Sequence, residues 1–567
     1  MNISGLAGLA ILCLNLSAQI AASAGSQQAR IEGKTVNLLD GAPIEGVALA
    51  LQPLSSPGAP QAKYVANSDQ HGAFVFDHLK PGAYRLHASR PGFLEQNFGA
   101  KRITDFGAQL ALAPGQNLNA LVFTLTPQGV ITGQVSDESG KPMKNSPITL
   151  IQRGYLPGTS HLRPVAGGST NDLGEYRIEG LSPGTYYAQA RRGVATQTGL
   201  QITNADAPSA LLPATPEESY VDTYYPNSVD FAGAIAFNIT AGADLRGMDI
   251  QLRKSRVFRV RGQVVDESGH PAIDAKVALT PVDRGGSNVV GLGTFGGSHI
   301  TGGNFEVVNI PPGSYELMAE VIKNNETLYA RQPVTVVDRN VTGIVIRVPD
   351  PVDVSGHVQI VAQQQSNGGV FPMSGVLVTL AATDGLANGR LPQAEIEGDG
   401  SFLFRRIPPD RYRLLFSRIP LGGYVKALVV GRQESTNGVV DLSFGGPLEI
   451  VIAMDIAEIV GSVVDAKGNP APGAILTIAP SEASRQGRIE LFRRTIADES
   501  GKFRFSVSPG SYRVLAWEDI DVDAPRNLEF LRFFEAGART VNAFESGRAT
   551  VQVKMLPIED IAKRLGY

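Results

Sequence analysis

The chain has one cysteine among 567 residues and a modest share of charged side chains. Cys13 lies in an apolar N-terminal stretch, so a disulfide framework, a cysteine-based zinc site and thiol catalysis are excluded from the rest of the chain. Charged residues make up 18% of the sequence, and the formal net charge is −4. A chain of this charge lacks the excess of positive side chains that nucleic-acid binding needs, so we expect no nucleic-acid partner.

Long hydrophobic runs are also missing, because no stretch after the N-terminal segment reaches the 18 or so apolar residues of a membrane-spanning helix. Leu6 to Leu16 is apolar and has the length of a signal-peptide core, and Ala22-Ser23-Ala24 supplies small residues for cleavage. The sequence predicts a signal peptide over residues 1–24 and no transmembrane span after cleavage. We expect an extracytoplasmic protein that is secreted, periplasmic or at the cell surface. An uncleaved anchor is the alternative.

Glycine and proline are abundant instead, with 63 and 36 residues, which indicates many turns. Three short motifs each recur five times. The first is a strand-like stretch with a central glycine, at Gly33, Gly133, Gly262, Gly356 and Gly461. The second is a glycine two residues before an aromatic residue, in the pairs Gly72/Phe74, Gly174/Tyr176, Gly303/Phe305, Gly400/Phe402 and Gly501/Phe503. The third is a Pro-Gly-x-Tyr turn, with the variant Pro409-Asp410-Arg411-Tyr412, whose tyrosines are Tyr84, Tyr186, Tyr315, Tyr412 and Tyr512.

The near-constant spacing of these motifs predicts a tandem array of repeated units. Short alternating runs separated by turns are typical of antiparallel sandwiches. The fold class is therefore all-β, with five Greek-key β-sandwich domains. The expected boundaries are residues 25–128, 129–256, 257–350, 351–457 and 458–567. The second domain carries an insertion of about 27 residues. Helical periodicity is expected only near Asp523 to Glu535 and over Pro557 to Leu565.

These motifs resemble the carboxypeptidase regulatory-like domain, a transthyretin-like (prealbumin-like) sandwich, and the chain is also similar to the carbohydrate-binding-like fold. The resemblance covers nearly all of residues 29 to 567, and the fourth copy departs most, with Asp410 in place of glycine. It implies a fold rather than a function, since such domains occur beside metallocarboxypeptidases, at the N-termini of outer-membrane receptors and in secreted arrays. None of the seven histidines has a glutamate three residues on, as a metallocarboxypeptidase zinc site would need.

Several motifs could carry chemistry, and each has a plainer interpretation. Gly180-Leu181-Ser182-Pro183-Gly184 fits a nucleophile elbow, but Pro183 lacks the N–H that an oxyanion hole needs, so a turn is favoured. Gly291 to Gly296 fits G-x-G-x-x-G without a following helix, which favours a glycine-rich loop. Asp519, Asp521 and Asp523 form either a solvated acidic loop or a cation site.

The aspartates that precede the second recurring glycine leave a similar choice. Each either bonds its own backbone in a turn or contributes to a calcium site. The four residues are Asp69, Asp172, Asp399 and Asp498. We favour turns, and we expect no metal, no cofactor and no catalytic residue.

Aromatic side chains are the remaining candidates for ligand binding. Tyr220, Tyr224 and Tyr225 cluster in the insertion of the second unit, and Trp517 is the only tryptophan. Each could contact a ligand or pack in a core. We expect a non-catalytic exported scaffold for binding or adhesion, whose partner is a glycan or a protein ligand at the cell surface. The alternative is an accessory module of a carboxypeptidase or outer-membrane receptor system.

Overall fold

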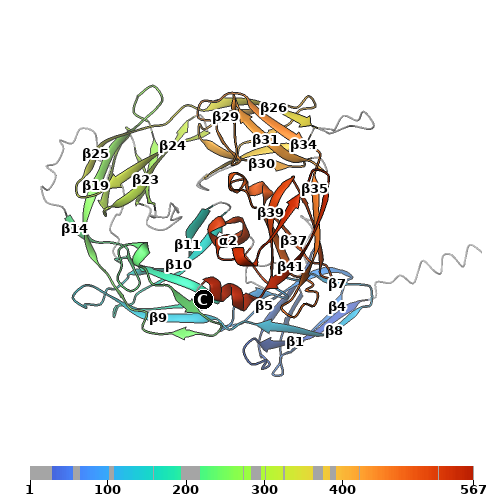
Figure 1. Ribbon diagram of the computed structural model, residues 1–567. Coiled ribbons are helices and arrows are strands. Elements are labelled where there is room, and N and C mark those ends of the chain that lie inside the picture. The colour runs from blue at the N-terminus through green and yellow to red at the C-terminus, as the bar shows by residue number, and fades with distance from the viewer. Residues whose placement is uncertain are drawn as a thin grey trace, which may run out of the picture. The chain divides into compact units, whose positions relative to one another are not determined.

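The computed structural model describes 13 segments of the chain, and their regular structure is almost entirely β (Figure 1). The segments are residues 28–54, 64–100, 107–156, 159–192, 217–272, 274–282, 295–300, 302–323, 326–361, 375–383, 391–419, 422–521 and 523–565. The expected signal segment, residues 1–24, lies outside them. The all-β fold class predicted from the sequence is confirmed.

The chain divides into two compact units. The first comprises Met1–Gln134, Glu175–Thr185 and Phe237–Asp249. The second comprises Val135–Gly174, Tyr186–Ala236 and Ile250–Tyr567. This division does not test the five expected domain boundaries, which stay a prediction.

Apart from β14, the strands of residues 29–251 form four sheets. The first has the order β4-β1-β8, with β1 (Ala29–Asn37), β4 (Ala73–Leu79) and β8 (Asn117–Leu125). The second has the order β3-β2-β5-β6, with β7 also on β5, from β2 (Ala48–Pro53), β3 (Tyr64–Asn67), β5 (Gly82–Ser89), β6 (Gln96–Asn97) and β7 (Leu110–Leu112). The third has the order β12-β9-β17, with β18 also on β9, from β9 (Gly129–Ser136), β12 (Glu175–Leu181), β17 (Asp244–Leu245) and β18 (Ile250–Gln251). The fourth has the order β11-β10-β13-β15, with β16 also on β13, from β10 (Pro147–Leu156), β11 (Thr159–Ser169), β13 (Gly184–Ala190), β15 (Thr223–Tyr224) and β16 (Phe237–Ile239).

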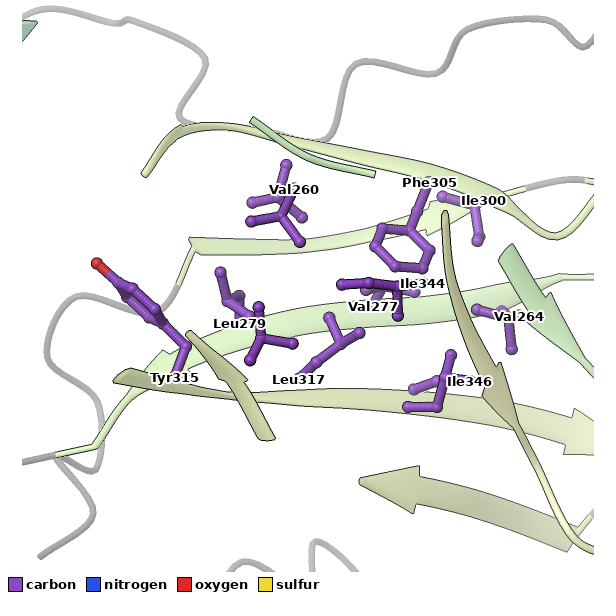
Figure 2. Close-up of a cluster of buried hydrophobic side chains, with 14 of the residues drawn as sticks. Val260, Val264, Val277, Leu279, Ile300, Phe305, Tyr315, Leu317, Ile344 and Ile346 are labelled. Carbon is purple, nitrogen blue, oxygen red and sulfur yellow. The ribbon is translucent and has the colours of Figure 1, made fainter. Parts of the chain in front are cut away.

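The next two sheets hold residues 217–347. One has the order β14-β19-β22, with β25 also on β19, from β14 (Glu217–Tyr220), β19 (Lys254–Val265), β22 (Asn304–Ile310) and β25 (Val341–Arg347). The other has the order β21-β20-β23-β24, from β20 (Ala275–Pro281), β21 (Phe295–Ile300), β23 (Gly313–Lys323) and β24 (Glu326–Val336). Figure 2 shows the apolar side chains of this segment, among them Val260, Val277 and Phe305, meeting in one buried cluster.

Residues 352–556 form the last three sheets. One has the order β29-β26-β34-β31-β32, from β26 (Val352–Val361), β29 (Ser401–Ile407), β31 (Tyr424–Val430), β32 (Gln433–Glu434) and β34 (Leu448–Ala453). Its partner has the order β28-β27-β30-β33, from β27 (Leu377–Ala382), β28 (Gln393–Glu395), β30 (Arg411–Ser417) and β33 (Val439–Asp441). The third has the order β37-β36-β39-β41-β35-β38, with β40 also on β39, from β35 (Ala457–Val464), β36 (Ile475–Pro480), β37 (Arg493–Ile496), β38 (Lys502–Val507), β39 (Gly510–Trp517), β40 (Arg539–Ala543) and β41 (Arg548–Leu556).

The recurring glycine of the first motif pairs with the recurring aromatic residue of the second motif in all five repeats. The pairs are Gly33↔Phe74, Gly133↔Tyr176, Gly262↔Phe305, Gly356↔Phe402 and Gly461↔Phe503. A Cβ on Gly33 would lie 2.5 Å from the Leu121 carbonyl oxygen and 2.5 Å from the ring of Phe74. The glycine is therefore needed because the neighbouring ring and the next strand occupy the space of a side chain.

The glycine of the second motif turns the chain into that aromatic strand. It has a positive φ in every repeat, from 71° at Gly501 to 88° at Gly400. Its carbonyl accepts a hydrogen bond from the N–H two residues after the first glycine, at 2.7–2.8 Å. The donors are Thr35, Val135, Val264, Val358 and Val463. The two motifs thus fix each other's position.

The tyrosine of the third motif is buried in all five repeats. In four repeats its hydroxyl donates to the carbonyl four residues earlier, as in the tyrosine corner of other sandwiches. The distances are 2.7 Å for Tyr84 to Lys80, 2.8 Å for Tyr315 to Pro311, 2.6 Å for Tyr412 to Pro408 and 2.8 Å for Tyr512 to Ser508.

Helical structure among the described residues is short. The expected helix near Asp523 to Glu535 is helical but interrupted, because Asn527 ends one turn and its side chain accepts the Phe530 N–H to cap the next. Its pieces are η4 (Ala524–Arg526), α2 (Leu528–Arg532) and η5 (Glu535–Gly537). The helix expected over Pro557 to Leu565 is confirmed as α3 (Ile558–Leu565). The other short turns are η1 (Phe231–Gly233), η2 (Ala483–Arg485) and η3 (Ile489–Leu491). No helix in the described ranges is long and apolar enough to cross a bilayer.

Two glycines of one repeat test the glycine–aromatic constraint. In Gly356→Ala the new methyl group would collide with the Phe402 ring, whereas a Cβ on Gly398 would meet nothing within 4 Å. We expect Gly356→Ala to lower the free energy of unfolding of this repeat by about 1–3 kcal/mol, and Gly398→Ala to change it by less than about 0.5 kcal/mol. Denaturant unfolding read by hydrogen exchange in residues 352–453 measures both. Equal losses in the two variants would contradict the constraint.

Candidate functional site

Tyr220 in the insertion has two cations against its ring. β14 pairs antiparallel with β19, which places Tyr220 opposite Lys254. The Lys254 Nζ lies 5.2 Å from the ring centroid, and the guanidinium carbon of Arg192 lies 5.3 Å from it. A cation at this distance is attracted to the negative face of an aromatic ring. The ring is half-buried and both cations are exposed, so the ring holds two positive groups at the surface.

The rest of this strand face carries one charge of each sign. Side chains alternate along a strand, so Glu218 shares a face with Tyr220, and its cross-strand partner is Arg256. Glu217 points to the other face, where it pairs with Arg259 at 3.0 Å. We call Arg192, Glu218, Tyr220, Lys254 and Arg256 the Tyr220 patch. A second carboxylate borders the patch, because the Glu138 Oε1 accepts the Lys254 N–H at 3.3 Å. Three cations against two carboxylates leave a net positive charge, which favours an anionic ligand.

A half-buried polar cluster lies just after Tyr220 in the chain. The Arg191 Nε lies 3.5 Å from the Asp222 Oδ2, and the Gln189 Nε2 donates to the same oxygen at 3.1 Å. Burial raises the pKa of the Asp222 carboxyl, and the nearby Arg191 works against that rise. This half-buried carboxylate is paired with Arg191 and Gln189, just after the end of β14.

The other two tyrosines of the cluster are placed differently. Tyr224 is buried, and its ring packs edge-on against Phe231 at a centroid distance of 5.5 Å. Tyr225 is half-buried, and its N–H donates to the Ala188 carbonyl at 2.9 Å. Tyr224 thus follows the packing alternative, and Tyr220 is the member of the three that borders exposed charge.

Trp517 is fully buried, so it follows the packing alternative. Its indole N–H donates to the Thr477 hydroxyl at 2.7 Å, and its ring packs against Phe530 and Phe534. The physical reason is the helical segment after β39, whose apolar side chains cover the outer face of the strand and form a second core with Trp517.

The recurring aspartates act as turn residues. The Asp498 carboxylate accepts the N–H groups of Ser500 and Lys502, each at 2.9 Å, and Asp69 accepts those of His71 and Ala73. Asp399 accepts the Ser401 N–H at 2.9 Å. In the second repeat this position is Asn171, which accepts the Leu173 N–H, rather than Asp172. The turn interpretation is therefore confirmed for Asp69, Asp399 and Asp498.

The remaining motifs are placed only in part. Ser182 lies in the turn between β12 and β13, as the turn interpretation predicts. The stretch from Gly291 to Thr294 lies outside the described residues. The Asp521 carboxylate accepts the Asp523 N–H at 3.0 Å, and Asp523 lies 3.4 Å from Arg526. In the described ranges no three His, Cys, Asp or Glu side chains are grouped to hold a metal ion.

Sequence reasoning missed four residues of the patch, namely Arg192, Glu218, Lys254 and Arg256. The sequence signal for Tyr220 was its tyrosine cluster, but nothing in the sequence places β14 beside β19. The charged residues near the insertion include Arg191 and Arg192, but the sequence does not show that Asp222 and the Tyr220 ring are their partners.

The family model of the carboxypeptidase regulatory-like domain matches residues 30–126 and 130–212. The chain is therefore similar to this domain over its first two repeats, which confirms the resemblance there. The third, fourth and fifth repeats share their glycine–aromatic pairs. No curated protein matches the chain.

Several solved structures of pilins are similar over part of the chain. The minor pilin GBS52 of Streptococcus agalactiae is 18% identical, with a TM-score of 0.21, over 40% of this chain and 95% of that one. A streptococcal ancillary pilin is 13% identical, with a TM-score of 0.17, over 53% and 99%. The major pilin subunit BcpA of Bacillus cereus is 12% identical, with a TM-score of 0.14, over 57% and 99%. TM-scores of this size assign neither fold nor function.

The turn aspartates make the fold sensitive to acid. Hydrogen bonds from backbone N–H groups lower the pKa of Asp498, and the same cause lowers that of Asp69. A lowered folded-state pKa gives stability that is present above the unfolded pKa of about 3.9 and is lost as the pH falls through the folded value.

Asp498→Asn tests this, because an amide oxygen can accept the same bonds without titrating, as Asn171 does. We expect near-unchanged stability at neutral pH and a smaller loss of the denaturant midpoint between about pH 5 and pH 2 than in the unaltered protein. Glu499→Gln, at an exposed neighbour, is the control. An unchanged acid loss in Asp498→Asn would refute the role of this carboxylate.

Trp517 provides a local fluorescence probe. Because its ring is fully buried and no other tryptophan exists, we expect emission at shorter wavelength than in denaturant and protection from iodide quenching. Emission of the native protein that iodide quenches as readily as that of the unfolded chain would show that the second core is not formed.

Proposed function

We propose that this chain is an exported, non-catalytic scaffold for binding or adhesion, and that its Tyr220 patch takes an anionic glycan. The supporting observation is the pair of cations, Arg192 and Lys254, held at 5.3 and 5.2 Å from one half-buried ring. Arg and Lys donors pair with carboxylate or sulfate groups through charge-assisted hydrogen bonds. The adjacent aromatic ring offers apolar area to a sugar.

The use of the recurring residues also favours a scaffold over an enzyme. The repeated aspartates accept backbone N–H groups, and four of the repeated tyrosines donate to backbone carbonyls. These polar groups are thereby engaged in holding turns, whereas a catalytic set needs nucleophile and base side chains within hydrogen-bond reach of each other. A protein ligand at the cell surface is the other partner that a patch of this kind could take.

Glycan-array binding tests the proposal with three variants. We expect Arg192→Ala combined with Lys254→Ala to weaken binding of acidic glycans by about 10- to 100-fold, since each charge-assisted contact contributes about 1.5–3 kcal/mol and part of this is lost to solvent exposure. Tyr220→Phe should retain binding because it keeps the ring, and Lys467→Ala, an exposed cation in a different turn, serves as the matched control.

Two outcomes would contradict this assignment. One is a blank array with well-folded protein, and the other is equal weakening by Lys467→Ala and the double variant. If a protein partner is captured and the double variant still binds it, the ligand site lies outside the Tyr220 patch.

An accessory role is the second candidate, and the match to the carboxypeptidase regulatory-like domain favours it. In that role the chain would serve a separate carboxypeptidase or outer-membrane receptor. Co-purification of such a protein with the tagged chain would support this role, and would not depend on Arg192 or Lys254.

A further inference from the structure

The first and last strands of the repeats are neighbours that run in the same direction. β1 pairs parallel with β8 from Arg30↔Asn117 to Asn37↔Leu125. β35 pairs parallel with β41 from Glu458↔Arg548 to Val464↔Lys554. β19 pairs in the same way with β25, and β26 with β34. The chain therefore enters at one end of a parallel strand pair and leaves at the other.

The last strand of one repeat leads almost directly into the first strand of the next. β8 ends at Leu125 and β9 begins at Gly129, while β34 ends at Ala453 and β35 begins at Ala457. The other two junctions, 252–253 and 348–351, are as short. A force applied to the two ends of the chain is thus passed from one parallel pair to the next.

This geometry loads the paired strands in shear. The two ends of the pair are pulled in opposite directions along the strand axis, so the evenly spaced hydrogen bonds of a parallel ladder carry the load together. Pulling both strands from the same end would instead break the bonds one after another. Side chains add to one pair, since the Arg548 Nε donates to the Glu458 Oε2 at 2.9 Å across it.

We propose that each repeat is a tension-bearing element, in which the parallel pair of first and last strands resists unfolding when the chain is pulled from its ends. The proposal deepens the proposed function, on which it rests, since a surface scaffold that holds a ligand must transmit the force on that ligand to its attachment. Resistance to force depends on the barrier to unfolding rather than on equilibrium stability.

The second repeat is the weakest element of this kind. Its first strand, β9, pairs parallel with β17 at Val130 and Ile131 and with β18 at Val135 and Ser136 only. Shorter pairing leaves fewer bonds to share the load. This repeat also contains the insertion, so its unfolding releases the longest stretch of chain.

Single-molecule pulling of one protein in two directions tests the proposal. The full chain carries Cys13→Ser and Glu545→Cys, which leaves one thiol as a handle in the exposed loop between β40 and β41. The first attachment uses the N- and C-terminal ends and shears every repeat. The second uses the N-terminal end and residue 545, which lies at the same end of the β35–β41 pair as the entering chain, because the Ser546 N–H donates to the Asp455 carbonyl at 3.0 Å.

End-to-end pulling should give separate unfolding peaks, each releasing on the order of 300 Å of chain for a repeat of about 100 residues at about 3.3–3.6 Å per residue. The lowest of these peaks should carry the longest release. With the handle at residue 545, the peak of the repeat that contains β35 and β41 should fall to less than about half its end-to-end force. The peaks of the other repeats should stay unchanged.

The proposal would be overturned if no peak fell in force in the second direction, or if end-to-end pulling gave no resolvable peaks. The shortest parallel pairing marks the second repeat as the one that resists force least. This claim would be overturned if the peak of lowest force did not release the longest stretch of chain. None of these force measurements involves a ligand. A failure of the tension-bearing proposal therefore does not affect the glycan-binding result, and an array without bound glycan does not affect the force result.

Discussion

A glycine that leaves room for a neighbouring aromatic ring is the contact on which each repeat depends. Gly461 lies opposite Phe503 on one side and beside the Val551 carbonyl on the other. Since both neighbours occupy the space of a side chain, any register that placed a larger residue there would be excluded. The glycine therefore sets the alignment of three strands: the first strand, the antiparallel aromatic strand and the parallel last strand.

The other recurring residues complete this arrangement. The positive-φ glycine before the ring accepts the N–H two residues beyond the first glycine, and the buried tyrosine closes the next turn through its hydroxyl. Asp498 also serves the turn, because its carboxylate accepts backbone N–H groups of the turn that leads into Phe503. The recurring polar residues thus serve the fold, and the insertion at Tyr220 is where the chain adds exposed charge on an aromatic support.

Much of the fold could be predicted because its signals are local and repeated. A glycine needed for positive φ, a turn tyrosine and an alternating strand give the same sequence pattern in each copy, and α3 shows its helical period within eight residues. The position of Trp517 was open, because burial depends on Phe530 and Phe534, which reach it through a helix that Asn527 interrupts. The Tyr220 patch could not be predicted, since it depends on the pairing of β14 with β19 across 34 residues of chain.

The central claim is that one hydrogen-bonded frame recurs in all five repeats, and amide hydrogen exchange of the full chain tests it most directly. The account predicts slow exchange at the N–H groups of Thr35, Val135, Val264, Val358 and Val463, each of which donates to a turn glycine. Protection at all five is the expected result. Fast exchange at any of the five in the native protein would show that the frame is absent from that repeat and would contradict the account.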